Sequence, residues 1–389
     1  MENIKFLNNL EISFSKNILN HLPTNSLGIY IHFPFCYKIC FYCDFFKIKP
    51  YKTNLYLNNL INELLSSKNY LDNINYNLKE VNTIYFGGGT PNLLNPKNID
   101  IILKIINKNF KISKNNEITI ELNPELITKN YIKTLKEIGI NRVSIGVQTF
   151  SLFGLRILGR TTDPNSIVSL IELTAKYFDN VSIDLIYLYP FQKIDSLIKD
   201  LEILKNLPIN HISYYALDIY DDKKVIYHKF NTIIEEINKI QENFQVFYNI
   251  IHQYLEDLGF EHYEVSNFAK NKKYCLHNLR YWYYLDYLGF GPSAVSKLNI
   301  NNKTIRITKK HINYFKNTTK ENTFKETIKN IEEIDYITSL KEKIMLSLRT
   351  KWGIQIKYNN INYNFKVHPL KFIKLNSIIH KIYNKLNLN

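Results

Sequence analysis

The sequence predicts an α/β fold, a partial (β/α)6 barrel with a smaller, mainly helical C-terminal domain. Two patterns support this prediction. From about residue 27 to residue 220, short runs of β-branched or aromatic residues alternate with segments whose apolar residues recur every three or four positions. Such alternation is typical of parallel strands joined by crossover helices. Six of these units are present, which is too few for a closed barrel, so we expect an open one.

The expected elements follow one another in strand–helix pairs. The strands are short and rich in β-branched and aromatic residues, and they are expected at 28–33, 83–86, 117–122, 142–147, 181–187 and 211–217. The helices have apolar residues on one face and are expected at 55–65, 99–106, 131–138, 167–177 and 197–204. In such folds the loops that follow the carboxyl ends of the strands carry the chemistry.

The pattern changes after residue 220. Apolar residues at helical spacing predict one long helix over 233–258, and Gly259 is a typical residue just beyond a helix end. An aromatic-rich segment and a mostly helical tail follow. We therefore expect an N-terminal extension (1–26), a barrel (27–224) and a C-terminal domain (225–389), with the linker at 221–224.

The composition favours a protein of a reducing compartment. The chain has four cysteines, and three of them lie between residues 36 and 43, so they do not form a disulfide framework. No apolar run approaches the roughly 18 residues that a membrane-spanning helix needs. Residues 1–26 lack the apolar region of a secretory signal. We expect a cytoplasmic protein.

The formal net charge of +15 at pH 7 does not predict a nucleic-acid partner. The whole chain is rich in Lys, Asn and Ile, and its positive charge is spread rather than clustered. A compositional bias of the genome explains this charge more simply than a binding function. The basic segment 371–385 could make a transient contact with an anionic membrane surface, although a solvated helix face is the simpler explanation.

The most informative motif is Cys36-x3-Cys40-x2-Cys43. It comes directly after the first predicted strand, so it belongs to the carboxyl edge of the sheet. Iron–sulfur clusters are usually held by four thiolates, and a cluster held by three has an iron that is free to bind a substrate. Two other interpretations stay open at this point. One is a zinc site completed by Cys275 or a nearby histidine, and the other is a set of free thiols.

Polar residues follow the later predicted strands, where a barrel interior would ordinarily be apolar. The second strand ends in Gly87-Gly88-Gly89-Thr90-Pro91, and glycines there let the backbone approach a ligand closely. Any one of the other polar residues is more simply explained as a satisfied structural group. Because consecutive units each supply one, they together predict a pocket for a zwitterionic, hydroxyl-rich ligand. These residues are Glu121, Gln148, Arg160 and Asp184.

These motifs resemble the radical S-adenosylmethionine superfamily. Within it they are similar to the branch that contains oxygen-independent coproporphyrinogen III oxidase and the heme chaperone HemW. The resemblance covers about residues 27–296 and weakens afterwards. It rests on YIHFPFCYKICFYCDF, FGGGTP, IELNPE, GVQTF, LGR, IDLIY, YEVSNFA and HNLRYW.

The resemblance implies a 4Fe-4S cluster and S-adenosylmethionine, whose amino and carboxylate groups would chelate the open iron. An electron from the cluster would then cleave the sulfonium, while the protein orients and shields the cofactors. By the same resemblance, Cys36, Cys40 and Cys43 hold the cluster, and Gly88, Gly89 and Thr90 cradle the methionine end. The other implied contacts of S-adenosylmethionine are Tyr30, Tyr42, Glu121, Gln148, Arg160, Asp184 and Ala216.

Two features separate the chaperone from the oxidase. The oxidase resembles C-x3-C-x2-C-x-C, and the position of its further cysteine is Phe45 in this chain. In addition, residues 277–282, HNLRYW, resemble the HNxxYW heme motif of the chaperone branch. The resemblance therefore implies bound heme with His277 as a ligand. The alternative is that His277 forms hydrogen bonds within the core while the aromatic residues pack, and Cys275 is either a second heme contact or a bystander.

The chain also departs from the motifs of this branch at several positions. Thr162 stands where histidine is usual. The usual Gly-Leu-Pro-Gly reads Leu188-Tyr189-Pro190-Phe191. The usual GPGAHS has Ser293 in place of its second glycine and Val295 in place of its histidine. These changes put the local shape beside the pocket in question.

The leading interpretation is a heme chaperone that carries a 4Fe-4S cluster and S-adenosylmethionine and transfers heme to an acceptor hemoprotein. Such a carrier is expected to lack coproporphyrinogen oxidase activity. The alternative is an oxygen-independent coproporphyrinogen III oxidase, or another radical enzyme that acts on a tetrapyrrole. A zinc-stabilised binding protein is the third hypothesis.

Overall fold

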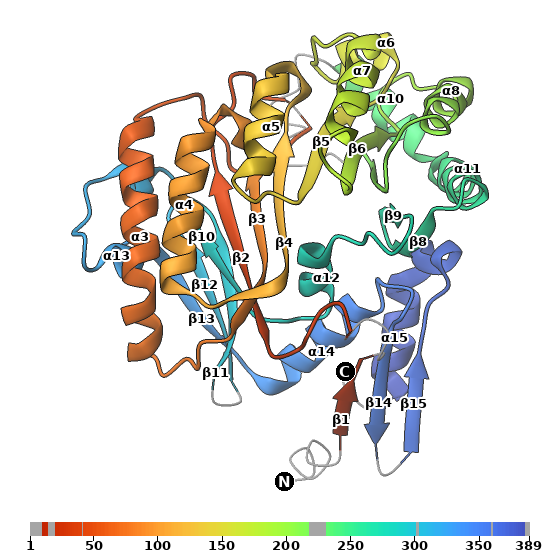
Figure 1. Ribbon diagram of the computed structural model, residues 1–389. Helices are drawn as coiled ribbons and strands as arrows, with labels where there is room; N and C mark the ends of the chain where they lie inside the picture. Colours follow the sequence, from red (N-terminus) through yellow and green to blue (C-terminus); the bar gives the residue numbers. More distant parts are fainter. Residues whose placement is uncertain are drawn as a thin grey trace.

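The computed structural model describes residues 10–14, 20–40, 42–217, 231–300, 303–358 and 361–385. Its main feature is a twelve-stranded sheet with the order β13-β12-β11-β10-β2-β3-β4-β5-β6-β7-β9-β8. Figure 1 shows this sheet with helices over its outer face and a smaller sheet beside it. The fold is α/β, and its barrel is open, as the sequence predicts.

Six parallel strands form the centre of the large sheet, and all six were predicted. They are β2 (Ser26–Phe33), β3 (Glu80–Gly88), β4 (Ile112–Leu122), β5 (Arg142–Gln148), β6 (Val181–Tyr187) and β7 (His211–Ala216). The predicted crossover helices are α3 (Thr53–Asn73), α4 (Pro96–Asn109), α5 (Lys129–Glu137), α7 (Pro164–Ala175) and α8 (Ile194–Leu204). A short helix that was not predicted, α6 (Leu152–Ile157), lies between β5 and α7.

The two faces of these strands differ in polarity, because successive side chains in a strand point to opposite faces. Ile31, Phe86, Ile120, Val143 and Val181 occupy neighbouring positions of successive strands and belong to the main apolar core. The adjacent positions on the other face contain Tyr85, Thr119 and Arg142. The barrel interior is therefore polar along this row.

The region after residue 224 corrects one part of the fold prediction, since it is mixed rather than mainly helical. Four of its strands continue the sheet beyond β2, and they are β10 (Tyr287–Phe290), β11 (Val295–Ile300), β12 (Lys303–Lys309) and β13 (Ile328–Ile334). Two more, β8 (Glu261–Glu264) and β9 (Asn267–Ala269), extend it beyond β7. Apart from β10, which runs parallel to β2, these strands pair antiparallel with their neighbours. Helix α13 (Thr323–Glu326) precedes β13.

The single long helix expected over 233–258 is instead two helices, α10 (Asn231–Gln241) and α11 (Phe244–Asp257). Their apolar spacing runs on through the break, which is why the sequence pattern did not reveal it. Gly259 follows α11 with a φ of +82°, in agreement with its predicted role at the helix end. The linker expected at 221–224 lies outside the described residues, and the domain boundaries stay a prediction.

A second core lies beside the barrel. It is built around the small sheet β1 (Leu10–Ser13), β14 (Ile354–Tyr358) and β15 (Ile361–Phe365) together with α12 (Leu276–Trp282), α14 (Tyr336–Ser347) and α15 (Leu375–Lys385). Figure 1 shows these elements below the right-hand side of the barrel. Helix α15 buries Leu375, Ile379 and Ile382 in this core, and the membrane contact of 371–385 stays a prediction. None of the described helices is both long enough and apolar enough to cross a bilayer.

Candidate cofactor site

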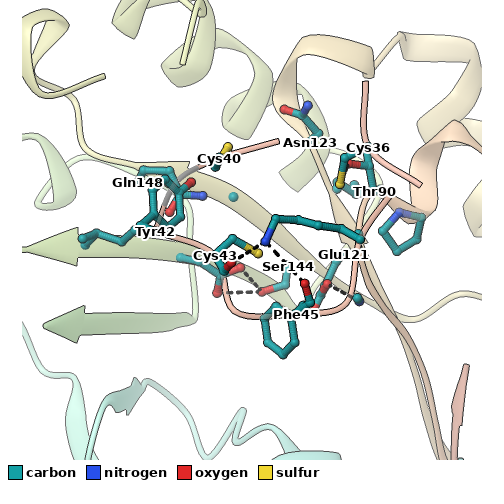
Figure 2. A pocket seen from close by; sticks show the side chains of 18 of the residues that line it. Cys36, Cys40, Tyr42, Cys43, Phe45, Thr90, Glu121, Asn123, Ser144 and Gln148 are labelled. Carbon is teal, nitrogen blue, oxygen red and sulfur yellow. Dashed lines mark hydrogen bonds between the residues drawn. The ribbon is translucent and has the colours of Figure 1, made fainter. Parts of the chain in front are cut away.

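A cavity of about 520 Å³ lies at the carboxyl edge of the six parallel strands. Its walls come from the cysteine loop after β2 and from the ends of β3, β4, β5, β6 and β7. Figure 2 shows that Cys36, Cys40 and Cys43 lie around this space together with Glu121 and Gln148. The other predicted residues that line the cavity are Tyr42, Gly88, Gly89, Thr90, Arg160, Asp184 and Ala216.

Backbone hydrogen bonds close the base of the cysteine loop. The Cys36 amide donates to the Ile48 carbonyl at 3.0 Å, and the Ile48 amide donates to the Pro34 carbonyl at 2.8 Å. These bonds join the chain just before the loop to the chain just after it, so the two ends of the loop lie side by side. Cys36 is buried, whereas Cys40 and Cys43 are only partly buried, and none of the three forms a disulfide. The Thr90 hydroxyl donates to Cys36 Sγ at 3.3 Å, so the loop is also tied to the end of β3.

The donor chemistry of this loop fits an iron–sulfur cluster held by three thiolates. Three thiols from one short loop line one cavity, and thiolates are the usual protein ligands of such clusters. Within the described ranges, no group of three or more His, Cys, Asp and Glu side chains is placed to hold a single metal ion. Cys275, the fourth ligand considered for zinc, does not line the cavity, and its Sγ lies 3.9 Å from Glu117 Oε1. Burial raises the pKa of Cys275 to about 12.

The glycine turn after β3 packs directly against the cysteine loop. The Gly89 amide donates to the Phe33 carbonyl at 2.6 Å, and the Thr90 amide donates to the Phe35 carbonyl at 2.9 Å. Gly88 has a φ of +108°, and a Cβ at this position would lie 2.6 Å from the ring of His32. A side chain cannot be accommodated there, so the turn requires glycine.

Two partly buried carboxylates, Glu121 and Asp184, give the cavity an acidic wall. Glu121 accepts hydrogen bonds from the Tyr85 hydroxyl at 2.9 Å and from the Gly88 amide at 3.1 Å. Burial, with the nearby Asp184 charge as a second cause, raises the pKa of Glu121 to about 7. Burial also raises the pKa of Asp184, which accepts from the Ser144 hydroxyl at 3.1 Å. Such a wall suits a cationic ligand, because binding a cation stabilises the ionised form of both groups.

The side chains of Gln148 and Arg160 both lie next to Gly146. Gln148 ends β5 with a φ of 74°, an unusual value for a residue other than glycine. The Arg160 guanidinium donates to the Gly146 carbonyl at 3.0 Å, which uses one of its five N–H groups. Its fork-shaped group can bind a ligand carboxylate with the remaining donors.

Two predicted site residues do not line the cavity. The Tyr30 hydroxyl shares a hydrogen bond of 3.0 Å with His32 Nδ1, and the Tyr30 ring lies next to the rings of Tyr85 and His277. His277 is buried, and both of its ring nitrogens have partners. Its Nδ1 lies 2.9 Å from Thr83 Oγ1, and its Nε2 lies 2.8 Å from the Tyr281 hydroxyl.

The neighbours of His277 show the packed arrangement that was the alternative to heme binding. Burial lowers the pKa of His277 well below its usual value, and the Arg280 charge adds to this effect. Tyr283 packs edge-on against Phe14 at 4.8 Å in the second core. The Tyr284 hydroxyl donates to Glu342 Oε2 at 2.5 Å. In this conformation the buried rings of Tyr283 and Tyr284 do not offer open faces to a porphyrin.

Comparison with known proteins assigns the family. Residues 30–204 match the model of the Radical SAM superfamily. The chain is 35% identical to "Heme chaperone HemW" of Buchnera aphidicola subsp. Acyrthosiphon pisum (strain APS) over 298 residues, which are 74% of this chain and 75% of the relative. It is 31% identical to "Heme chaperone HemW" of Bacillus subtilis (strain 168), with 84% of each chain covered. The chain belongs to the HemW family of radical SAM proteins.

A solved structure supports the same fold. Coproporphyrinogen III oxidase (HemN) from Escherichia coli, described as a radical SAM enzyme, has a TM-score of 0.69 to this structure. The match covers 96% of this chain and 85% of the oxidase at 21% sequence identity. This similarity concerns the fold alone. Membership of the radical SAM superfamily implies a 4Fe-4S cluster and S-adenosylmethionine, and the cavity has suitable donors for both.

The departures from the HemW family motifs keep the backbone shape that glycine would give. Leu188, Phe191 and Ser293 stand at positions where glycine is usual, and their φ angles are 61°, 63° and 63°. A residue with a Cβ costs roughly 1–2 kcal/mol in this left-handed conformation. The surrounding structure therefore maintains the turns although the glycines are missing.

Thr161 and Thr162 donate hydrogen bonds to Glu125 in the cavity wall. They lie in the segment where this family usually has a histidine. Glu125 Oε1 accepts from the Thr161 amide at 3.1 Å, from the Thr161 hydroxyl at 2.5 Å and from the Thr162 hydroxyl at 3.1 Å. These bonds lower the pKa of Glu125. These bonds and the nearby Arg160 charge therefore favour the ionised form of the Glu125 carboxylate.

Several cavity residues were not identified from the sequence. Arg142, Ser144, Gly146 and Gln148 lie at every second position of β5, and all four line the cavity. This alternation was the signal that could have revealed them, but only Gln148 was selected. Arg142 is almost completely buried, and its Nε has no hydrogen-bond partner. The other lining residues that were missed include Lys47, Asn123, Glu125, Ser213, Tyr215 and Asn278.

Proposed function

We propose that this protein is a heme chaperone that uses a 4Fe-4S cluster and S-adenosylmethionine and delivers heme to an acceptor hemoprotein. The observation that carries the proposal is its similarity, over about three quarters of both chains, to a protein named heme chaperone HemW. The cavity with its three thiols and two partly buried carboxylates supports the cofactor part. The four cysteines lie in the described part of the chain and form no disulfide, which suits the reducing environment of the cytoplasm.

The residues of the cavity have complementary roles in holding the two cofactors. Cys36, Cys40 and Cys43 would bind the cluster, which supplies the electron for reductive cleavage of S-adenosylmethionine. The turn at 88–90 would carry the methionine end, because its backbone lies against the cysteine loop. Arg160 would bind the carboxylate, and Glu121 with Asp184 would face the cationic and hydroxyl-bearing parts.

His277 is the proposed heme ligand. Imidazole is a common axial ligand of heme iron, but one ring nitrogen of His277 first has to leave Thr83 or Tyr281. Heme ligation at this residue therefore includes a local rearrangement of α12 or of the ring itself. The proposal predicts slower heme binding than at an open surface histidine.

Heme titration tests this function, with absorbance as the readout. Wild-type protein is expected to bind about one heme per chain, and His277→Ala is expected to lose or shift the spectrum. His211→Ala is a matched control, because His211 is equally buried and has the same kind of partners, Ser182 at 2.8 Å and Tyr263 at 2.7 Å. A wild type without any stoichiometric change would refute heme binding. A His277→Ala titration equal to that of the wild type would refute the assigned ligand.

The second candidate function is an oxygen-independent coproporphyrinogen III oxidase. The Escherichia coli oxidase has the same fold over nearly the whole chain, so the fold alone does not separate the two functions. The position of the oxidase's further cysteine is occupied by Phe45, whose side chain is exposed at the cavity rim. An anaerobic assay with coproporphyrinogen III, a reductant and S-adenosylmethionine separates the two functions. Turnover of the tetrapyrrole supports the oxidase, and its absence together with stable heme binding supports the chaperone.

A further inference from the structure

Helix α12, which carries the HNLRYW segment, is fastened to the amino ends of the strands that support the cofactor loops. The buried Arg280 guanidinium donates to the Ser26 carbonyl at 3.0 Å and to the Asp286 carbonyl at 2.9 Å, and it also binds the side chain of Asn82. At Gly28 a Cβ would lie only 2.5 Å from Arg280 Cδ. The motif is therefore part of the barrel framework as well as a candidate heme site.

One contact route connects the His277 ring to the acidic wall of the cavity. The ring stacks on Tyr85, with the centroids 5.2 Å apart and the planes inclined by 26°. The Tyr85 hydroxyl donates to Glu121 Oε1 at 2.9 Å, and Glu121 Oε2 accepts from the Gly88 amide at 3.1 Å. A displacement of His277 thus removes a packing partner from the tyrosine that orients Glu121.

A second contact route leads from the same ring to the cysteine loop. His277 stacks on Tyr30 with a centroid distance of 6.3 Å. The Tyr30 hydroxyl shares a hydrogen bond of 3.0 Å with His32 Nδ1, and His32 Nε2 lies 2.8 Å from the carbonyl oxygen of Phe46. Phe46 follows Cys43 by three positions. Tyr30 therefore acts on the cofactor site through His32, although it does not line the cavity.

His277 cannot ligate heme and keep these contacts unchanged. Its side chain is 1% exposed, and both ring nitrogens are occupied. A heme iron has to displace Thr83 or Tyr281 and draw the ring towards itself, away from the stacks with Tyr85 and Tyr30. Heme ligation would thus move the His277 ring away from Tyr85 and Tyr30, whereas the contacts that orient Glu121 and the cysteine loop need the ring to stay in place.

We propose that heme ligation at His277 and S-adenosylmethionine binding in the cavity oppose each other, so that S-adenosylmethionine binding promotes heme release. The proposal rests on the proposed function. Coupling between two sites is reciprocal, and its usual size corresponds to a change of about 5- to 150-fold in affinity. Heme therefore weakens S-adenosylmethionine binding by the same factor by which S-adenosylmethionine weakens heme binding.

The test measures both affinities on wild-type protein in which the cluster has been reconstituted without oxygen. Heme binding is followed by absorbance with and without saturating S-adenosylmethionine. S-adenosylmethionine binding is followed by equilibrium dialysis with and without heme. Both dissociation constants are expected to rise by the same factor, about fivefold or more. Equal affinities with and without the other ligand, or a gain in affinity, would overturn the inference while heme binding itself still supports the proposed function.

Two variants identify the route of the coupling. Tyr85→Phe keeps the ring stack but removes the hydroxyl that binds Glu121, so heme should still bind while the coupling factor falls towards one. His211→Ala, the matched control, should keep the wild-type factor. An unchanged factor in Tyr85→Phe, or an equal loss in His211→Ala, would contradict the route through Glu121. Wild-type protein that binds no heme at all would overturn the proposed function and this inference together.

Discussion

The raised pKa of Glu121 makes S-adenosylmethionine binding dependent on pH. Burial and the Asp184 charge bring this pKa to about 7 in the free protein. A sulfonium ligand prefers the ionised carboxylate, so the protein has to release a proton when it binds below this pH. The affinity is therefore expected to increase as the pH rises and to level off above the pKa.

The size of the effect follows from the fraction of Glu121 that is ionised. With a pKa of about 7, roughly one tenth is ionised at pH 6 and roughly nine tenths at pH 8. The dissociation constant should then fall about tenfold over this range, equivalent to about 1.4 kcal/mol. The lower pKa of Glu121 in the complex is the source of this free energy.

The assay is equilibrium dialysis of S-adenosylmethionine with the cluster-containing protein between pH 6 and pH 8. Glu121→Gln is the matched variant, because it keeps the shape of the side chain and cannot be ionised. The α-amino group of S-adenosylmethionine titrates near pH 8 and affects the wild type and the variant alike. The difference between their two pH profiles of affinity therefore reports on Glu121 alone. A wild-type affinity that does not vary with pH, or a variant profile parallel to that of the wild type, would refute the reasoning.

Two further predictions concern stability, and both are measured by chemical denaturation. Phe191→Gly should be more stable than Phe191→Ala by about 1 kcal/mol, because Phe191 has a φ of 63°, which favours glycine. Phe191 is 41% exposed, so both variants lose similar packing. An alanine variant of equal or greater stability would contradict this. Lys309→Met should cost about 3–5 kcal/mol, because it leaves Glu63, now 2.9 Å from Lys309 Nζ, as a buried charge. The control Lys303→Met breaks an exposed pair on the same strand and should cost at most about 1 kcal/mol, so equal losses would count against the explanation.

The barrel and the position of its cofactor site were predictable because they depend on local patterns. β-Branched runs and helical apolar spacing are properties of neighbouring residues, and every predicted parallel strand is present. The cysteine loop follows the first of these strands, and parallel strands bring their carboxyl ends to one edge. The order of the elements therefore placed Cys36 and Asp184 in one cavity.

The rest of the sheet depends on contacts between residues distant in sequence. Strand β10 pairs with β2, with Gly289 opposite Tyr30, and no local pattern specifies that partner. The break between α10 and α11 was hidden because Ile240 and Phe244 keep the helical spacing on either side of it. Leu188 and Ser293 have left-handed φ angles that residue type alone does not predict, because the surrounding turns impose them.

Two predicted site residues, Tyr30 and His277, do not line the cavity, and the sequence motifs did not predict this placement. Tyr30 and His277 belong to recognisable sequence motifs, but their side chains point into the packed region behind the cavity, where they contact each other. Sequence spacing identifies which residues occur together, whereas the fold determines which atoms reach a ligand. Arg142 illustrates the opposite case, since it resembles a surface residue in the sequence and is buried at the cavity.

Electron paramagnetic resonance of the reduced, anaerobically reconstituted protein tests the central claim most directly. The claim is that Cys36, Cys40 and Cys43 hold a 4Fe-4S cluster with one iron open to S-adenosylmethionine. Addition of S-adenosylmethionine is predicted to change the spectrum of the wild-type cluster. A cluster whose spectrum stays the same at saturating S-adenosylmethionine, or protein that retains zinc without iron and sulfide, would contradict the account.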